Sequence, residues 1–242
     1  MKTKKMRLDR FLVHTGYGSR SEVQKLIKQG KVRVKDEIVK KADYSLEVLK
    51  DQVTVQGEEV LYQEFYYYIL NKPAGYITAT EDLRQETVLD LLEPIDKNKG
   101  LCPVGRLDKD TEGLLVLTND GQLNHALLSP KKHVDKVYYA KLQGRVTLED
   151  VTRFKEGIVL EDGTVFQSAI LEIIEAGPLS EVYVTIKEGK FHQVKRMALA
   201  IGKEVLYLKR VQMGGLSLPS DLALGAYRPL TEIELKKLKG EE

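Results

Sequence analysis

Apolar residues near the N-terminus recur with the spacing of short helices. Leu8, Phe11 and Leu12 stand at positions i, i+3 and i+4, so they share one face of a helix. A second helix is predicted to start at Ser19, because Ser19 and Glu22 have the spacing of a capping box that satisfies free backbone amides. The chain therefore begins with two short amphipathic helices.

Residues 31–34 alternate basic and apolar side chains, which predicts a strand whose cations face outward. Gly30, just before this strand, is placed to end the preceding helix in the left-handed conformation. A last small strand is expected at residues 53–55, followed by a linker over residues 58–64. The pattern therefore predicts a small domain over residues 1–57.

The rest of the chain, residues 65–242, is predicted to form a second domain with mostly strand-like patterns. Strands are expected at residues 66–70, 76–79, 114–117, 138–142, 165–173 and 182–186. Helical spacing is confined to residues 122–128, 148–155, 192–201 and a short basic segment at the end. Because strands dominate and no regular crossover helices separate them, we predict an α+β fold with a mainly antiparallel sheet.

Charge is distributed unevenly along the chain. The net charge is +2, yet residues 1–41 hold 13 Lys and Arg against 4 Asp and Glu, which gives +9 there and −7 over the remainder. Such an excess within a folded pattern favours contact with a polyanion over a solvated tail. The candidate contacts are Arg7, Arg10, Ser19, Arg20, Lys25, Lys28, Lys31 and Arg33.

Membrane insertion and secretion find no support in the sequence. No apolar run approaches the ~20 residues that span a bilayer, and no apolar segment follows the basic N-terminus. Cys102 is the only cysteine, so no intrachain disulfide can form and a reducing cytoplasm is expected. A lone cysteine of this kind is most often a small buried side chain.

The densest polar cluster lies directly before a predicted buried strand. Asp108, Asp110 and Glu112 match the first ligand positions of an EF-hand calcium loop. The twelfth position of such a loop should be Glu, but it is Asn119, and the intervening residues belong to the strand. Calcium binding is therefore disfavoured, and composition alone predicts a solvated loop of charges.

Three spaced elements lie in the N-terminal segment, namely Arg7-Leu-Asp-Arg-Phe-Leu, Ser19-Arg-Ser-Glu and Leu26-Ile-Lys-Gln-Gly-Lys-Val-Arg-Val34. Through these elements, residues 6–55 resemble the S4 RNA-binding module. The resemblance implies that the basic residues of this segment contact RNA phosphates, which position RNA without reading its sequence.

Four motifs lie in order over residues 69–197. They are Asn71-Lys-Pro-Ala-Gly-Tyr76, then Gly105-Arg-Leu-Asp108 with Thr111, Gly113-Leu-Leu and Thr118-Asn-Asp-Gly121, then Lys136-Val-Tyr138, and finally Glu188-Gly-Lys-Phe-His-Gln-Val-Lys-Arg-Met197. These motifs resemble those of the pseudouridine synthases that modify ribosomal RNA. Together with the preceding S4 module, they are similar to the branch that modifies the small subunit. That branch implies a uridine of 16S rRNA as target, the family expectation being uridine 516.

The resemblance implies specific roles for site residues. Asp108 corresponds to the essential aspartate, Tyr138 to the aromatic residue against the target base, and Lys195 to the basic residue paired with the aspartate. Arginine is common at this last place in the superfamily, whereas lysine resembles the small-subunit branch. Further substrate contacts are expected from Arg106, Thr111, His192, Gln193 and Arg196.

The implied reaction explains these residue types. Uridine loses its N–C1′ bond, turns and rejoins through C5, so nothing is oxidised and no cofactor or metal is expected. The sequence offers no glycine loop for a nucleotide and no Cys/His metal spacing. A carboxylate can act as nucleophile or base, and Lys195 would favour its ionised state at Asp108. The target nucleotide is expected to flip into the pocket.

Two alternatives remain open from the sequence. The substrate could be a uridine of 23S rRNA in the large subunit, since the motifs barely distinguish the two. A non-enzymatic RNA-binding assembly factor would suit an S4 module, but it leaves most of the chain unexplained, and Asp108 is present. We therefore expect a cytoplasmic monomer, outside any membrane, whose partner is ribosomal RNA in a small-subunit assembly intermediate.

Overall fold

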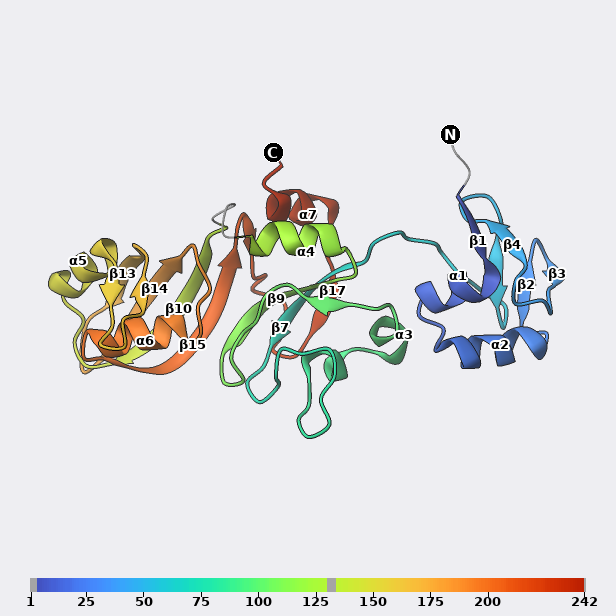
Figure 1. Ribbon diagram of the computed structural model, residues 1–242. Coiled ribbons are helices and arrows are strands. Elements are labelled where there is room, and N and C mark those ends of the chain that lie inside the picture. Colours follow the sequence, from blue (N-terminus) through green and yellow to red (C-terminus); the bar gives the residue numbers. More distant parts are fainter. Residues whose placement is uncertain (1–3, 130–133, 242) are drawn as a thin grey trace. The chain divides into compact units, whose positions relative to one another are not determined.

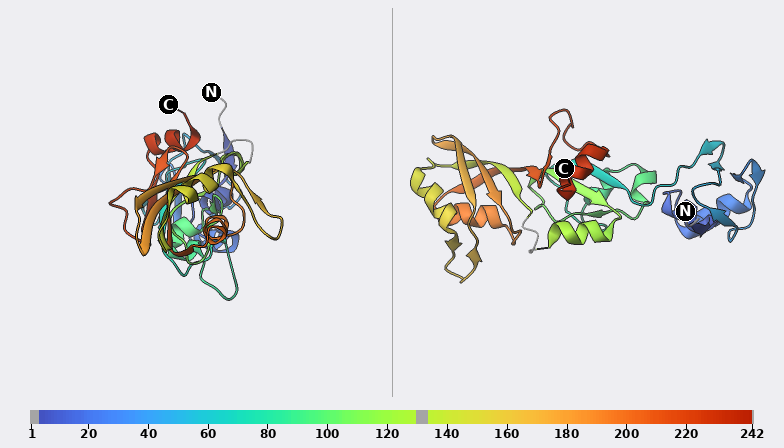
Figure 2. Two further views of the ribbon diagram at one scale, coloured as in Figure 1. Left: turned by 90° about the vertical axis from the view of Figure 1, so that its left-hand side faces the viewer. Right: turned by 90° about the horizontal axis from the view of Figure 1, so that it is seen from above.

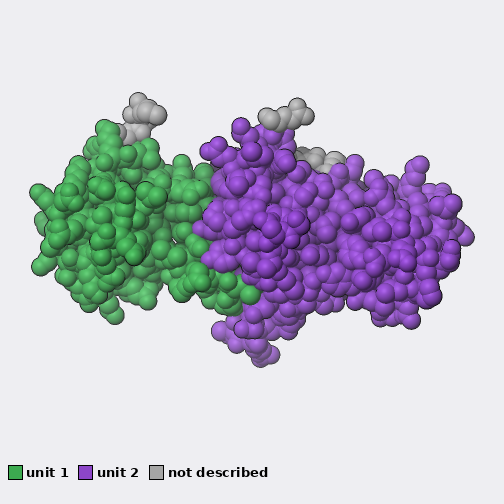
Figure 3. All heavy atoms as spheres, turned by 180° about the vertical axis from the view of Figure 1, so that it is seen from behind, with its two compact units in different colours: residues 1–66, 89–102 green, residues 67–88, 103–242 purple. Residues whose placement is uncertain are grey.

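The computed structural model describes residues 4–129 and 134–241. The chain divides into two compact units, coloured separately in Figure 3. Unit 1 comprises residues 1–66 and 89–102, and unit 2 comprises residues 67–88 and 103–242. Neither unit is a single stretch of chain, so the chain passes between them more than once.

The elements follow one another as labelled in Figure 1. The helices are α1 (Leu8–His14), α2 (Arg20–Lys28), the 3-10 helix η1 (Val88–Leu91), α3 (Pro94–Lys97), α4 (Gly121–Leu128), α5 (Leu148–Glu156), α6 (Gln193–Ala200) and α7 (Glu232–Lys239). The strands are β1 (Lys5–Arg7), β2 (Val32–Val34), β3 (Glu37–Ile38), β4 (Ser45–Glu47), β5 (Val53–Val55), β6 (Glu58–Glu59), β7 (Tyr67–Lys72), β8 (Cys102–Pro103), β9 (Glu112–Thr118), β10 (Lys136–Gln143), β11 (Ile158–Val159), β12 (Val165–Phe166), β13 (Ile170–Glu175), β14 (Leu179–Ile186), β15 (Glu204–Met213), β16 (Leu216–Ser217) and β17 (Tyr227–Pro229).

Unit 1 confirms the two predicted helices. The predicted apolar face of α1, formed by Leu8, Phe11 and Leu12, is buried in the core of this unit. Ser19 caps α2, and both halves of its capping box with Glu22 are formed. These helices pack with a four-stranded sheet in the order β3-β2-β5-β6 and with the pair β1-β4.

The predicted strand at residues 53–55 continues into a hairpin. Gln56 and Gly57 have φ values of 55° and 93°, and Val55 pairs with Glu58 across this two-residue turn. Such a turn with positive φ matches the twist of the flanking strands. Residues 58 and 59, assigned above to the linker, therefore form β6 of unit 1.

Unit 2 is built on a nine-stranded sheet with the main order β13-β14-β10-β15-β9-β7-β17. Among the described strand pairs of this sheet, β15 and β9 run parallel and the others run antiparallel. This arrangement agrees with the predicted α+β fold. The predicted strand at 114–117 is the buried centre of β9.

Several sequence-based boundaries were wrong. Residues 76–79 form no strand, because their backbone pairs only through an isolated bridge between Ile77 and Thr87. The hydroxyl of Thr78 in this segment donates to the carbonyl of Leu107. The predicted strand at 165–173 is interrupted, giving β12 and β13. The ten-residue β15 was not predicted at all. Cys102, expected to be buried, is exposed.

The helices of unit 2 lie at different parts of the sheet. α5 and α6 pack beside β13 and β15, as Figure 1 and Figure 2 show in yellow and orange. α7 contributes Leu238 to a core that also holds Leu127 of α4 and Val116 of β9. Within the described residues, no helix is both long and apolar enough to pass through a bilayer.

Candidate active site

The loop that carries Asp108 is anchored by a buried ammonium group. Lys72, at the end of β7, has no exposed surface. Its Nζ donates to the carbonyl oxygens of Pro73, Asp108, Lys109 and Thr111 at 3.0, 3.2, 3.2 and 2.9 Å. One side chain therefore ties the carbonyl of Asp108 and the backbone that follows it to the end of β7.

Burial lowers the pKa of Lys72 to about 8, although Asp110 and Glu112 act in the opposite direction. The four carbonyl oxygens favour the charged ammonium, which has three hydrogens to donate. Lys72 lies in the first of the four motifs, but no role was predicted for it from the sequence. Its role as an anchor depends on contacts with a loop 36 to 39 residues later in the chain.

A second anchor holds the start of the same loop. The hydroxyl of Thr78 donates to the carbonyl of Leu107 at 2.7 Å and lies 3.1 Å from the Leu107 amide, which donates to it. The amide of Thr111 then closes a turn on the carbonyl of Asp108 at 3.1 Å. The Asp108 side chain therefore projects from a backbone that is hydrogen-bonded on either side.

The structure brings Asp108 and Lys195 together. Nζ of Lys195, from α6, lies 3.2 Å from Oδ2 of Asp108. On its other oxygen, Asp108 faces Nε2 of His192 at 3.5 Å. The carboxylate is 27% exposed, so it is sheltered and still open to a substrate.

Lys195 also contacts the carboxylate of Asp110, which was not predicted to belong to the site. Its Nζ donates to Oδ1 of Asp110 at 2.6 Å, which is shorter than its distance to Asp108. Burial would lower the pKa of Lys195, but its bonds to Asp110 and Asp108 raise it above the usual value. For Asp110, burial acts to raise the pKa, but the hydrogen bond and positive charge of Lys195 outweigh burial, so the pKa of Asp110 is lowered. Lys195 is therefore a cation shared by two carboxylates.

The start of α6 presents His192 and Lys195 on one side. His192 is in the left-handed conformation with φ of 48°, and Phe191 stacks on its ring at 3.8 Å between centroids. Gln193 turns inward, where its Nε2 donates to Glu188 at 2.8 Å. Met197, one turn further along, is fully buried, in agreement with the helical spacing predicted for residues 192–201.

Tyr138 lies on β10 and lines the same cavity as the loop that carries Asp108. It is 7% exposed and pairs in register with Arg210 on one neighbouring strand and with Val184 on the other. Thr111 is also buried, and its hydroxyl has no hydrogen-bond partner within the described part of the chain. Both side chains line the space next to Asp108.

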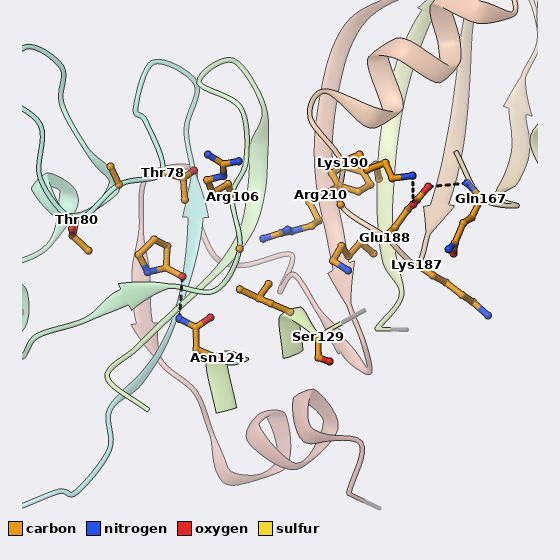
Figure 4. A pocket seen from close by; sticks show the side chains of 17 residues that line it. Thr78, Thr80, Arg106, Asn124, Ser129, Gln167, Lys187, Glu188, Lys190 and Arg210 are labelled. Carbon is orange, nitrogen blue, oxygen red and sulfur yellow. Dashed lines mark hydrogen bonds and ion pairs between the residues drawn. The ribbon is translucent and has the colours of Figure 1, made fainter. Parts of the chain in front are cut away.

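Two adjoining cavities open at these residues. The smaller, of about 60 Å³, lies at Asp108, and the larger, of about 880 Å³, is shown in Figure 4. Arg106, Tyr138, Gly189 and Lys190 line both. The predicted site residues that line the smaller cavity are Arg106, Asp108, Thr111, Tyr138, His192, Gln193 and Lys195.

Arg196, the remaining predicted substrate contact, lies apart from these cavities. Its guanidinium bonds to the carboxylate of Asp162 and, at 3.1 Å, to the hydroxyl of Thr164. It therefore ties α6 to the turn between β11 and β12.

No group of three or more potential ligand side chains that could hold a metal ion was found among the described residues. Glu112, one of the three acidic residues that suggested a calcium loop, instead accepts a hydrogen bond from the hydroxyl of Tyr207 at 2.6 Å.

In unit 1, the predicted RNA contacts fall into two groups. The side chains of Arg10, Arg20, Lys25, Lys28, Lys31 and Arg33 are exposed. Arg7 instead donates twice to Asp9, at 3.0 and 2.8 Å, and this bond lowers the pKa of the Asp9 carboxyl. Ser19 is occupied as the cap of α2. These last two side chains have structural roles in unit 1.

Comparison with known proteins gives consistent matches. The family model described as RNA pseudouridylate synthase matches residues 66–200, and the S4 domain model matches residues 6–53. A Bacillus subtilis (strain 168) protein named uncharacterized RNA pseudouridine synthase YtzG is 49% identical, covering 96% of this chain and 98% of its own.

Two further relatives carry more specific names. The ribosomal small subunit pseudouridine synthase A of Escherichia coli (strain K12) is 39% identical, covering 95% of this chain and 98% of its own. The ribosomal large subunit pseudouridine synthase B of Bacillus subtilis (strain 168) is 38% identical, covering 96% and 95%. A solved pseudouridylate synthase structure matches with a TM-score of 0.67 and 36% identity, covering 96% of this chain and 99% of that chain.

Proposed function

Because this chain belongs to the RNA pseudouridine synthase family and carries an S4 domain, we propose that it isomerises one uridine of 16S rRNA with Asp108 as the catalytic carboxylate. The observation that carries the proposal is the Asp108 carboxylate, held 3.2 Å from the Lys195 ammonium at a cavity that Tyr138 also lines. The target within that branch is expected at uridine 516.

Each residue has a defined part in the proposed reaction. Asp108 acts on the flipped nucleotide as nucleophile or base, and the ammonium of Lys195 positions the carboxylate through an ion pair. Tyr138 lies against the uracil ring and confines it while the N–C1′ bond breaks and the C5–C1′ bond forms. His192 and Thr111 supply polar contacts to the base from either side of Asp108.

The small subunit is favoured by two observations. The last motif has Lys195 in the sequence His-Gln-Val-Lys-Arg-Met, which resembles that branch, and the small-subunit relative matches along nearly its whole length. The large-subunit relative is almost equally similar, so 23S rRNA is the second candidate substrate. We further propose that the protein acts as a monomer in the cytoplasm, on a small-subunit assembly intermediate.

The decisive experiment maps pseudouridine in both ribosomal RNAs, with and without the gene. The proposal expects a single 16S site to disappear in the deletion strain and to return with the wild-type gene but not with Asp108→Asn. Loss of a 23S site would reassign the substrate. Loss of none in either RNA would refute a ribosomal target.

A further inference from the structure

The charged residues that line the larger cavity beside Asp108 are mostly cations. Its basic lining residues are Arg106, Lys136, Lys187, Lys190 and Arg210, and its one acidic lining residue is Glu188. Glu188 is already engaged, because its Oε1 accepts from the amide of Gln167 and from the side chain of Gln193, both at 2.8 Å, and its Oε2 pairs with Lys190 at 3.2 Å. The remaining cations of the cavity are left without this counterion.

Arg210 is the least explained of these cations. It is 1% exposed on β15, and its Nε donates to the carbonyl of Leu114 at 2.8 Å. Its Nη2, also buried, has no hydrogen-bond partner in the described chain. In Figure 4 the guanidinium is directed into the cavity, on the side where Arg106 stands. A buried charged donor without a partner is costly, so a ligand that accepts from it would recover that cost.

A second buried cation lies near Arg210. Lys136 is 9% exposed on the neighbouring strand β10, and its Nζ donates to the carbonyl of Val134 at 2.9 Å. Burial lowers the pKa of Lys136, the positive charge of Arg210 lowers it further, and Asp135 acts in the opposite direction. Asp135 is not among the residues that line the cavity. The two cations therefore repel each other until an anion lies between them.

We propose that Arg210 and Lys136 bind a phosphodiester group of the substrate RNA, which seats the nucleotide adjoining the target uridine in the larger cavity. This inference rests on the proposed action on RNA. A phosphate oxygen forms a strong hydrogen bond with a guanidinium group, and this bond is stronger when water is excluded from both groups. Tyr138 lines both cavities. If the target base lies against Tyr138 next to Asp108, the adjoining phosphate of the RNA backbone therefore lies close to Arg210 and Lys136.

The test replaces single phosphates of the RNA by neutral methylphosphonates. The full-length protein is titrated with a labelled rRNA fragment centred on the mapped uridine, with one substitution at a time on either side of it. For wild type, we expect one position to weaken binding about tenfold and to reduce the slope of log affinity against log salt by about 0.7. In Lys136→Met and Arg210→Gln, the same substitution should cost little, because the contact is already lost.

Controls separate the site from general electrostatics and from unfolding. Lys155→Met removes a charge from an exposed position on α5 and should keep the full methylphosphonate penalty. If Arg210→Gln lowers the thermal midpoint strongly, Lys136→Met alone decides the result. An equal penalty in wild type and Lys136→Met at every position would overturn the proposal.

Failure of this inference can be distinguished from failure of the proposed function. Pseudouridine mapping reports the reaction, whereas the phosphate scan reports binding at equilibrium. A protein that makes pseudouridine but shows no coupling between Lys136 and any phosphate would retain its function and lose this site. If no uridine maps, the scan is centred in turn on the uridines of the 16S fragment that the protein binds, and coupling there would support the site while the function fails.

Discussion

Asp108 and Asp110 provide a matched pair for testing which carboxylate reacts. Both lie within reach of Lys195, at 3.2 and 2.6 Å, but only Asp108 lines the smaller cavity. Asp108→Asn keeps the shape of the side chain without a nucleophile or base, so the single-turnover rate should fall by about a thousandfold or more. Asp110→Asn should cost less than about tenfold, as expected for an exposed ion pair.

RNA affinity distinguishes loss of chemistry from loss of binding in these variants. Asp108→Asn should bind the rRNA fragment as tightly as wild type, because phosphate contacts provide most of the affinity. If Asp108→Asn kept a tenth of the wild-type rate, or if Asp110→Asn were the inactive variant, the assignment of Asp108 would be wrong.

Lys195 is expected to act through charge. Its raised pKa keeps the ammonium protonated throughout the neutral range. Lys195→Met removes the cation nearest to Asp108 and with it the ion pair that positions the carboxylate. The rate at pH 7 should fall, whereas Lys195→Arg should keep more activity because the charge remains.

Single-turnover rates at saturating enzyme test this role directly, since RNA affinity then drops out of the comparison. A Lys195→Met variant with the single-turnover rate of wild type, together with weaker RNA binding, would show that Lys195 only contacts a phosphate.

At the scale of elements, the loop that carries Asp108 depends on its anchor in β7. Lys72→Met leaves four carbonyl oxygens without their donor and should lower the free energy of unfolding by about 2–4 kcal/mol. Lys141→Met, which removes a partly exposed partner of Glu181, should cost about 1 kcal/mol or less. Urea denaturation of the two variants measures the difference.

The pKa of Lys72 also predicts an alkaline limit to activity. Below about pH 8 the side chain is a charged ammonium, and above it the neutral amine has one hydrogen fewer for the loop. The wild-type rate should therefore decline as pH rises through about 8. A rate that stays flat to pH 10 with folded protein would argue against a protonation-dependent anchor.

Elements with local signals were the ones that the sequence predicted well. The capping box at Ser19 and the apolar spacing of α1 and α6 depend on residues within a few positions of one another. β15 has no such signal, because the inward position between Leu208 and Met213 is taken by Arg210, a charged side chain that interrupts the apolar alternation. A pattern that assumes polar residues face outward cannot detect a strand of this kind.

The residues of the candidate site also divide into those that the sequence identified and those that depend on contacts distant in sequence. Asp108, Tyr138 and Lys195 were identified through the resemblance, and the structure places all three at one cavity. Lys72, Asp110 and Arg210 were missed because their roles arise from contacts with residues far away in sequence. The carbonyl of Leu114 that Arg210 binds, for instance, lies 96 positions earlier.

For the whole molecule, the uneven charge predicts where salt acts on RNA binding. Lys25, Lys28 and Lys31 are exposed in unit 1, and changing all three to Gln removes three phosphate-binding charges while leaving the core intact. The slope of log affinity against log salt should become shallower by about 2–3. Single-turnover chemistry at saturating enzyme should be unchanged.

The matched control changes Lys236, Lys237 and Lys239 of α7 to Gln, which alters net charge equally. Its salt slope should stay near that of wild type. If the control flattened the slope as much as the unit 1 variant, the N-terminal charges would have no special part in binding.

Unit 1 includes residues 89–102, which are synthesised only after the chain has begun unit 2. Gly16, with φ of 94°, fits so closely against Ile95 that an added Cβ would lie 2.0 Å from its carbonyl oxygen. Protein domains generally fold in order as they leave the ribosome. Here unit 1 can complete its contacts only after residue 102 has been synthesised. By then β7 of unit 2, including Lys72, has already been synthesised, before the loop that Lys72 anchors.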